Sequence, residues 1–393
     1  MKIRFICLLL LAFTAALLSG CWDRKEMNTL AIVLGAGIDH TPGNQVMLTL
    51  QLARPGYTLG AANGGEEPGI WVVSETGRTV YEAQGKLANR LSRRIYWSHN
   101  VILVFGEDAA RQGIRRYTSF FSRSMQDRET TWVMVAPGQA RDILETSSVL
   151  EDSSAQAAAY LERAGTCYGI RFLDLKVMLA AKGDNPVAPR VEVVASGVTP
   201  VLDEEEPVRT KSAALTGTAV FRDDKLVGWL DETETRGLLW LRGELEQGVV
   251  VVPSPDNPGK YSSVEIIGMH MKVKPQYDGN TVRCNVKIVT EGELREQQST
   301  EVDITQPEIH AELENKMAGV IANEARLALN KAQEEYGVDI FNFGTAFHRK
   351  YPREWAELQD RWNEVFTGVQ VDLTVEANLK FTGLTGRRGS IKE

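Results

Sequence analysis

The sequence predicts an α+β fold in which small sheets, antiparallel or mixed, carry helices packed on them. Three observations lead to this prediction. Several short segments alternate apolar and polar residues and are joined by turn sequences, as antiparallel strands are. Other segments repeat their apolar residues at helical spacing and begin with residues that cap helices. The two kinds of segment alternate along the first half of the chain, which favours helices packed on a sheet.

The first half begins with a predicted hairpin. Residues 30–39 are rich in Ile, Val and Leu, 41–44 form a turn cluster, and 45–53 alternate as a returning strand. Residues 60–69 hold four glycines, a proline and two glutamates, which indicates an exposed loop. The remaining segments of this half are predicted as strands at 70–74, 100–105 and 130–136, and as helices at 79–94, 108–121, 139–146, 153–163 and 173–181.

The second half is predicted to combine hairpins with one long helix. Asn185-Pro186 and Ala188-Pro189 interrupt the regular pattern, and the acidic run 203–207 ends in a proline, so it is the best candidate for a linker. The Asp-Gly pair within 277–280 is a strong hairpin signal. The predicted elements are a hairpin at 217–230, helices at 231–245, 307–337 and 347–366 with a break at Pro352, and strands at 248–252, 263–274, 281–291 and 370–382.

The first 21 residues resemble a lipoprotein signal. Lys2 and Arg4 precede an uncharged stretch at 5–18, which is shorter than the roughly 20 residues of a membrane-spanning helix. Leu17-Leu18-Ser19-Gly20-Cys21 then has the lipobox pattern, so we expect cleavage before Cys21 and a diacylglycerol thioether on its sulfur. The alternative is an ordinary signal peptide with a cysteine beside its cleavage site. With the lipid, the remaining chain would be tethered to the outer face of a membrane.

Composition limits the class of protein. A hydrophobic content of 43% suits packed cores. The formal net charge is −8 and becomes −10 once Lys2 and Arg4 are removed with the signal, which disfavours nucleic acid as a partner. The same net charge predicts no electrostatic attraction to anionic lipid, so the lipid on Cys21 would have to hold the protein at the membrane.

No motif in the chain indicates a catalytic, metal or cofactor site. The five histidines lack metal-ligand spacing, and HExxH, paired CxxC, GxSxG and P-loop motifs are absent. Gly35-Ala36-Gly37 follows a strand, but the third glycine of a dinucleotide-binding loop is missing and a second strand follows instead of a helix. The sequence therefore argues against an enzyme, although active sites assemble in space and an anchored hydrolase stays an alternative.

Two groups of residues have a structural and a functional interpretation. Asp231, Glu232 and Glu234 are better explained as residues that start a helix than as an acid–base pair. For Trp355 and Trp362 the structural interpretation is again the better one. They are seven residues apart on one helix face and fill a core more readily than they form a ligand site.

Two cysteines remain outside the signal and the lipid site. Cys167 and Cys284 could pair in an extracytoplasmic compartment. Because they fall in different predicted domains, two separate buried thiols are the favoured interpretation.

Several short blocks together resemble the Ger(x)C family, the C-subunit lipoproteins of spore germinant receptors. They occur in the family's order and extend over almost the whole mature chain. The blocks are Cys21–Asn28 with Leu30–Val33, Gly37–Asp39, Gly77–Thr79, Trp97–His99, Gly217–Phe221 with Lys225–Leu230, and Tyr351–Trp355 with Trp362 and Phe366.

The resemblance implies three α+β domains and a non-enzymatic role beside membrane-embedded A and B subunits. The complex would respond to nutrients from the spore inner membrane, with this chain held by lipid on the outer leaflet. The expected division is a cleaved signal at 1–20, an N-terminal domain at 21–205, a middle domain at 206–262, a C-terminal domain at 263–386 and a tail at 387–393. Trp22, Asp23 and Glu26 directly after the anchor are candidates for contact with a partner.

A solute-binding lipoprotein of a transporter is the main alternative. The anchor and the chain length fit that class. Such proteins usually have two similar α/β lobes, however, and the second half shows no repeated βαβ pattern.

Overall fold

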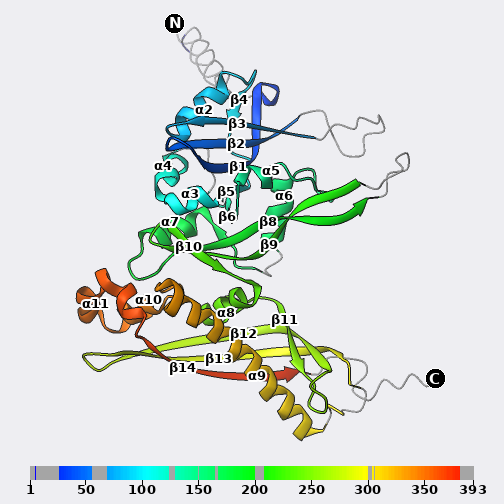
Figure 1. The fold of residues 1–393 in the computed structure, drawn as a ribbon, viewed down its shortest axis with the longest axis vertical. Helices are drawn as coiled ribbons and strands as arrows, with labels where there is room; N and C mark the ends of the chain where they lie inside the picture. Colours follow the sequence, from blue (N-terminus) through cyan, green and yellow to red (C-terminus); the bar gives the residue numbers. More distant parts are fainter. Residues whose placement is uncertain are drawn as a thin grey trace, which may run out of the picture.

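The structure is a computed structural model of the whole chain. It describes Phe5 and residues 26–54, 69–123, 129–148, 150–163, 167–199, 208–299, 303–304 and 306–380. Two sheets organise these residues, one of ten strands and one of four, and helices pack on both (Figure 1). The predicted α+β class is therefore confirmed. None of the helices among the described residues is both long and apolar enough to cross a membrane.

The first sheet is mixed. Its strands follow the order β10-β9-β8-β6-β5-β1-β2-β3, in which β1, β5, β6 and β8 run parallel and the other neighbours antiparallel. Short strand β4 pairs with the start of β1, and β7 pairs with β6. The bounds are β1 (Leu30–Thr41), β2 (Gln45–Ala53), β3 (Ile70–Gly77), β4 (Arg94–Tyr96), β5 (Ile102–Gly106), β6 (Trp132–Ala136), β7 (Ile170–Arg171), β8 (Val187–Thr199), β9 (Val208–Arg222) and β10 (Lys225–Leu230).

Helices cover both faces of this sheet. Strand β5 is buried along its whole length, with Leu103 and Phe105 in the main core and Ile102 and Val104 in a second core under α5 and α6. Burial on both faces is why the strand is continuously apolar instead of alternating. The helices are α2 (Val80–Ala88), α3 (Glu107–Gln112), α4 (Arg115–Arg123), α5 (Ala140–Leu144), α6 (Ser154–Arg163) and α7 (Phe172–Ala180).

The structure corrects three predicted elements of the first half. The helix predicted to close at Arg93 and Arg94 ends at Ala88, and Arg94 begins β4. The helix predicted over 108–121 divides at Gly113, whose φ of 105° is outside helical geometry. The prolines near the start of β8 predict an interruption, yet β8 pairs with β9, with a register shift between Arg190 and Val191.

The second sheet has the order β11-β12-β13-β14 and is flanked by the remaining helices. Helix α9 packs against β11 and β14, and a π-helical turn, η2, extends it to Tyr336 before Gly337 ends it in the left-handed region. The bounds are β11 (Gly248–Pro253), β12 (Tyr261–Tyr277), β13 (Val282–Gln297), β14 (Gln370–Lys380), α8 (Glu232–Arg242), α9 (Pro307–Asn330), η2 (Lys331–Tyr336), α10 (Phe343–Lys350), α11 (Pro352–Leu358), η3 (Gln359–Arg361) and α12 (Trp362–Phe366).

Several local predictions of the second half are confirmed. Asp231 caps α8, and its side chain and that of Glu234 accept from each other's backbone N–H, so these carboxylates do start a helix. Trp355 and Trp362 are buried in the core. Cys167 and Cys284 are not joined by a disulfide, and Cys284 is buried whereas Cys167 is half-buried.

The predicted domain boundaries fall within continuous structure. Strands β8 and β9 lie on either side of the cut near 205 and pair with each other, while the acidic run 203–207 lies outside the described residues. The cut at 262 falls at the start of β12. The predicted middle segment thus supplies β9 and β10 to the first sheet and β11 to the second, and the division into three domains stays a prediction.

Candidate functional site at the junction of the two sheets

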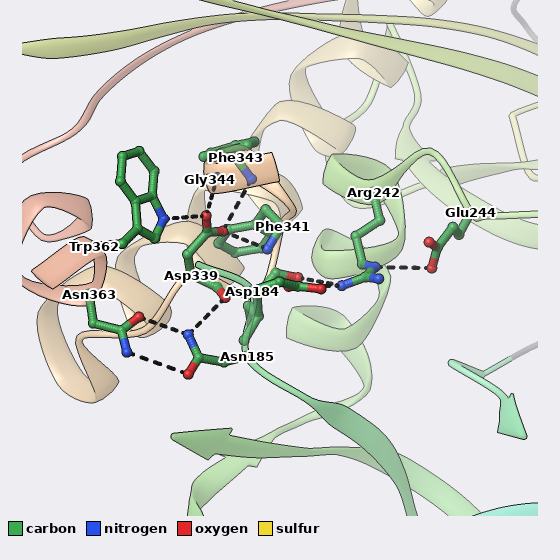
Figure 2. A network of polar contacts seen from close by, with 11 residues as sticks. Asp184, Asn185, Arg242, Glu244, Asp339, Phe341, Phe343, Gly344, Trp362 and Asn363 are labelled. Atoms are coloured by element: carbon green, nitrogen blue, oxygen red, sulfur yellow. Dashed lines mark hydrogen bonds and ion pairs between the residues drawn. The ribbon is translucent and has the colours of Figure 1, made fainter. Parts of the chain in front are cut away.

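The two sheets meet at a buried polar network, here called the junction network (Figure 2). Its residues come from the segment before β8, from the end of α8, from the segment after η2 and from the start of α12. They are Asp184, Asn185, Arg242, Asp339, Trp362 and Asn363.

Asp339 is the centre of this network and is completely buried. The backbone N–H groups of Phe341 and Phe343 donate to its Oδ1 at 2.9 and 3.4 Å. Gly344 N and Trp362 Nε1 donate to Oδ2 at 2.7 and 2.8 Å. Burial raises the pKa of this carboxyl above its ordinary value, and the four donors oppose that shift. Its oxygens are filled by donors of the chain itself, so Asp339 organises the loop that starts α10.

Asn185 connects the first sheet to that loop. Its backbone N–H and its Nδ2 both donate to the carbonyl oxygen of Asp339, at 2.9 and 3.1 Å. The same Nδ2 donates to Asn363 Oδ1 at 2.8 Å, and the side-chain oxygen of Asn185 accepts from Asp223 N at 3.2 Å. One side chain therefore holds three segments together, as Figure 2 shows for Asp339 and Asn363.

Arg242, at the end of α8, also connects segments of the junction network. Its side chain is 6% exposed and its Nη1 lies 3.9 Å from Oδ1 of Asp184, which is 7% exposed. It donates to the carbonyl of Ile340 at 2.9 Å and to Glu244 at 3.1 Å, and its guanidinium lies over the ring of Tyr168 at 5.2 Å. Burial raises the pKa of Asp184 to about 7 although Arg242 opposes the shift.

Close backbone approaches accompany these polar contacts. A Cβ on Gly344 would lie 2.4 Å from the carbonyl oxygen of Gly183, and a Cβ on Gly183 would lie 2.1 Å from the ring of Trp355. Gly183 also has a φ of 76°. The two segments can only meet this closely because both residues are glycine.

Hairpin β9–β10 is held against η2 by a second set of contacts. The hydroxyl of Tyr336 accepts from Trp229 N at 3.0 Å and donates to Trp229 O at 2.8 Å, which is the pairing a neighbouring strand would make. Arg222 Nη2 donates to the carbonyl of Tyr336 at 2.6 Å. The hairpin of the first sheet is thereby fixed to the helix of the second.

Helices α8 and α9 complete the joint through buried Glu324. Arg236 Nε and Trp240 Nε1 donate to its Oε2 at 2.8 and 2.9 Å, and Arg236 Nη2 also donates to Oε1. Gly237 brings the two helices together, since a Cβ there would lie 2.1 Å from the carbonyl oxygen of Glu324. Taken together, these contacts fix α8 to α9. The described residues hold no cluster of His, Cys, Asp or Glu placed for a metal ion.

We expect the junction to lose stability as the pH rises. Between about pH 4 and 7 Asp184 keeps its proton in the folded state and loses it in the unfolded state, so raising the pH favours unfolding by as much as about 4 kcal/mol. Asp39, whose pKa burial raises to about 6, adds to the same slope. Urea unfolding at a series of pH values should show this decline, and Asp184→Asn should flatten it. If stability falls with pH as steeply in Asp184→Asn as in the wild type, the decline does not come from Asp184.

The structure describes one of the four residues predicted as sites from the sequence. Cys21, Trp22 and Asp23 are outside the described residues. Glu26 is exposed, and its carbonyl accepts from Thr29 N at 3.0 Å and from Thr29 Oγ1 at 2.7 Å, which starts the short turn before β1. Sequence reasoning missed the junction, because Asn185-Pro186 was interpreted as an interruption.

Two family models match the chain in order. The first, described as the spore germination protein N-terminal domain, covers residues 23–193. The second, described as spore germination B3/GerAC like, C-terminal, covers residues 216–383. The chain belongs to the Ger(x)C family of spore germination proteins.

Relatives of similar length support this membership. Spore germination protein KC of Bacillus subtilis (strain 168) is 26% identical, and the alignment covers 96% of each chain. Spore germination protein B3 of the same organism is 23% identical over 95% of this chain and 97% of the relative. A crystal structure of the GerBC protein shares the fold with a TM-score of 0.56 at 17% identity, over 91% of this chain and 99% of that chain.

The junction network spans the two matched regions of this Ger(x)C protein. Asp184 and Asn185 lie in the N-terminal match, whereas Arg242, Asp339 and Trp362 lie in the C-terminal match. The contacts of Asn185 with Asp339 and of Arg242 with Asp184 therefore join the two family regions to each other.

Proposed function

We propose that this protein is the lipid-anchored, non-enzymatic C subunit of a spore nutrient-germinant receptor, required for the germination response to nutrients. The observation that carries the proposal is the ordered pair of family matches over residues 23–193 and 216–383. The relatives named above are spore germination proteins by name and align over nearly their whole length. The polar contacts of the junction favour a structural role, in which the chain holds partner proteins, over a catalytic role.

In this proposal the chain is a rigid extracytoplasmic platform for the A and B membrane subunits. The joint supports that role because its buried groups bond to one another across the two sheets. Leaving any of those donors or acceptors unpaired costs about 1–3 kcal/mol, which opposes hinge motion between the sheets. Partner surfaces would then keep a constant spacing relative to the membrane.

The proposed anchor is the lipid on Cys21. Each buried methylene of an acyl chain contributes about 0.8 kcal/mol, so a single chain binds reversibly while two or three hold the protein firmly. Trp22, Asp23 and Glu26 follow the anchor directly, and we propose that they contact a membrane partner or the first domain.

Affinity purification from spore inner membranes tests this function. The tagged protein should bring A- and B-type receptor subunits with it, identified by mass spectrometry. Cys21→Ala should lose its acyl groups, be released or mislocalised, and recover neither partner, while its thermal unfolding stays that of the wild type. Cys167→Ala is the matched control, since it removes a half-buried thiol with no proposed lipid and should keep both membrane attachment and partners.

Other partners would overturn the proposal. Recovery of a permease and an ATPase would assign the chain to the solute-binding lipoproteins of transporters, and calorimetric titration with amino acids and sugars should then show a saturable site. If Cys21→Ala stays fully attached to the membrane and recovers the same partners, the lipid anchor is contradicted but the receptor role is not.

A further inference from the structure

An arginine-lined cleft lies among α2, β4 and α4. Figure 1 shows these elements at the end of the molecule opposite the four-stranded sheet. The volume of the cleft is about 950 Å³. Five arginines line it from separate segments, and no acidic residue is among its lining residues. They are Arg78, Arg93, Arg94, Arg116 and Arg123.

Among the described residues, only one of these arginines pairs with a carboxylate. Within the described part of the chain, Arg78 pairs with Glu82 at 3.0 Å, and Arg116 donates to Asn44 Oδ1 at 3.0 Å. Arg93, Arg94 and Arg123 form no ion pair there, whereas Arg90, Arg111 and Arg141 each pair with a glutamate. Planar guanidinium groups that converge without carboxylates suit a phosphate, which they bind through two parallel hydrogen bonds.

The floor and rim of the cleft are apolar and aromatic. Trp97 is buried with its ring edge-on to Phe120 at 5.7 Å, and its Nε1 donates to Gln84 at 2.9 Å. Tyr81 is 71% exposed at the rim, with its ring 6.3 Å from that of Phe120. Amphipathic rings beside cations are typical of protein surfaces at the lipid headgroup level.

The charge of this region is opposite to that of the whole chain. Residues 78–123 contain nine Lys and Arg and three Asp and Glu, a net charge of +6, in a chain of net charge −8. The other residues therefore carry −14 in total. The sequence-based expectation of no attraction to anionic lipid rested on the sum and does not hold for this end of the molecule.

The cleft also lies near the start of the described chain. Strand β4, which begins with Arg94, pairs with β1 at Leu30–Ile32. Leu30 follows Cys21 by nine residues, a segment that spans at most about 30 Å when fully extended. A lipid on Cys21 would therefore keep the arginines close to the bilayer surface.

We propose that the cleft among α2, β4 and α4 binds the phosphate-bearing headgroup of an anionic phospholipid, with the apolar floor against its glycerol and acyl portion. The choice of a bilayer lipid over a soluble anion rests on the anchor of the proposed function and on the aromatic rim. Binding there points the α2–α4 end of the molecule at the membrane and the four-stranded sheet away from it.

Vesicle flotation of the chain from Trp22 to Glu393, made without acyl groups, tests the site independently of the anchor. Every helix and strand bounded above lies after Trp22, so this chain keeps them all. It should float with vesicles containing phosphatidylglycerol and not with vesicles of phosphatidylcholine alone, and added salt should weaken binding. The combined change Arg93→Gln, Arg94→Gln and Arg123→Gln should weaken partitioning about 100-fold, at about fivefold per basic residue.

Matched controls separate the site from general charge. Lys272→Gln, Lys274→Gln and Arg349→Gln remove the same charge from exposed positions of β12 and α10 and should leave partitioning unchanged. Equal binding to neutral vesicles, or unchanged binding of the triple arginine variant, would overturn the proposal. So would arginine-dependent binding of free glycerol phosphate without vesicle binding, which would assign the cleft to a soluble phosphate ester. Each result stands whether or not receptor subunits co-purify with the protein.

Discussion

Replacing Asp339 with alanine is expected to lower the free energy of unfolding by about 4 kcal/mol or more. The substitution leaves Phe341 N, Gly344 N and Trp362 Nε1 without their acceptor in a site that water does not reach. Each buried donor left unpaired costs about 1–3 kcal/mol. The loss should also loosen the loop whose carbonyl receives both hydrogen bonds from Asn185, and with it the joint between the sheets.

Urea unfolding followed by tryptophan fluorescence measures this loss. Asp339→Asn is the graded comparison, because its amide oxygen can still accept from Phe341 N while its NH₂ would face two donors, so about half the loss is expected. Asp372→Ala removes an exposed carboxylate whose partner Arg283 lies 3.7 Å away, and should change stability by less than about 0.5 kcal/mol. Equal stabilities of wild type and Asp339→Asn would show that the four donors do not depend on the carboxylate.

Gly237→Ala is expected to destabilise the protein by about 3 kcal/mol, although alanine is the better helix former. Its Cβ would lie 2.1 Å from the carbonyl oxygen and 2.8 Å from the carbonyl carbon of Glu324, both backbone atoms of α9 that cannot turn aside. Helices α8 and α9 must then separate, which also stretches the hydrogen bonds from Arg236 and Trp240 to Glu324. This overpacking outweighs the gain of about 1 kcal/mol from helix propensity.

Gly319→Ala provides the matched control in the same pair of helices. Gly319 lies inside α9, and a Cβ there would meet nothing within 4 Å. Only the propensity gain remains, so this variant should be about 1 kcal/mol more stable than the wild type. The two glycine-to-alanine changes should thus have opposite signs in one denaturation experiment. If both stabilise the protein, α8 and α9 do not approach as closely as the structure places them.

Local features could be predicted from the sequence because they depend on residues a few positions apart. The capping pair of Asp231 and Glu234 spans one helical turn, and the Asp-Gly turn after Tyr277 joins two adjacent strands. The prolines before and within β8, by contrast, led the sequence-based prediction away from the strand that forms there. Pairing with β9 and the register shift after Pro189 override the local preference of proline against strands, and nothing within the segment itself reveals that pairing.

By itself, the sequence determined the α+β class and the family, since each is carried by composition, by short contiguous motifs or by their order. The lipid site at Cys21 stays a prediction from the sequence. Only the tertiary structure decided which distant residues meet. Asn185 and Asp339 are 154 positions apart, and the arginines of the cleft come from separate segments around α2, β4 and α4. The physical reason is that such contacts depend on strand order and helix packing, which no local periodicity records. The net charge of the chain is an example, because a sum over all residues cannot show where the fold brings charged residues of one sign together.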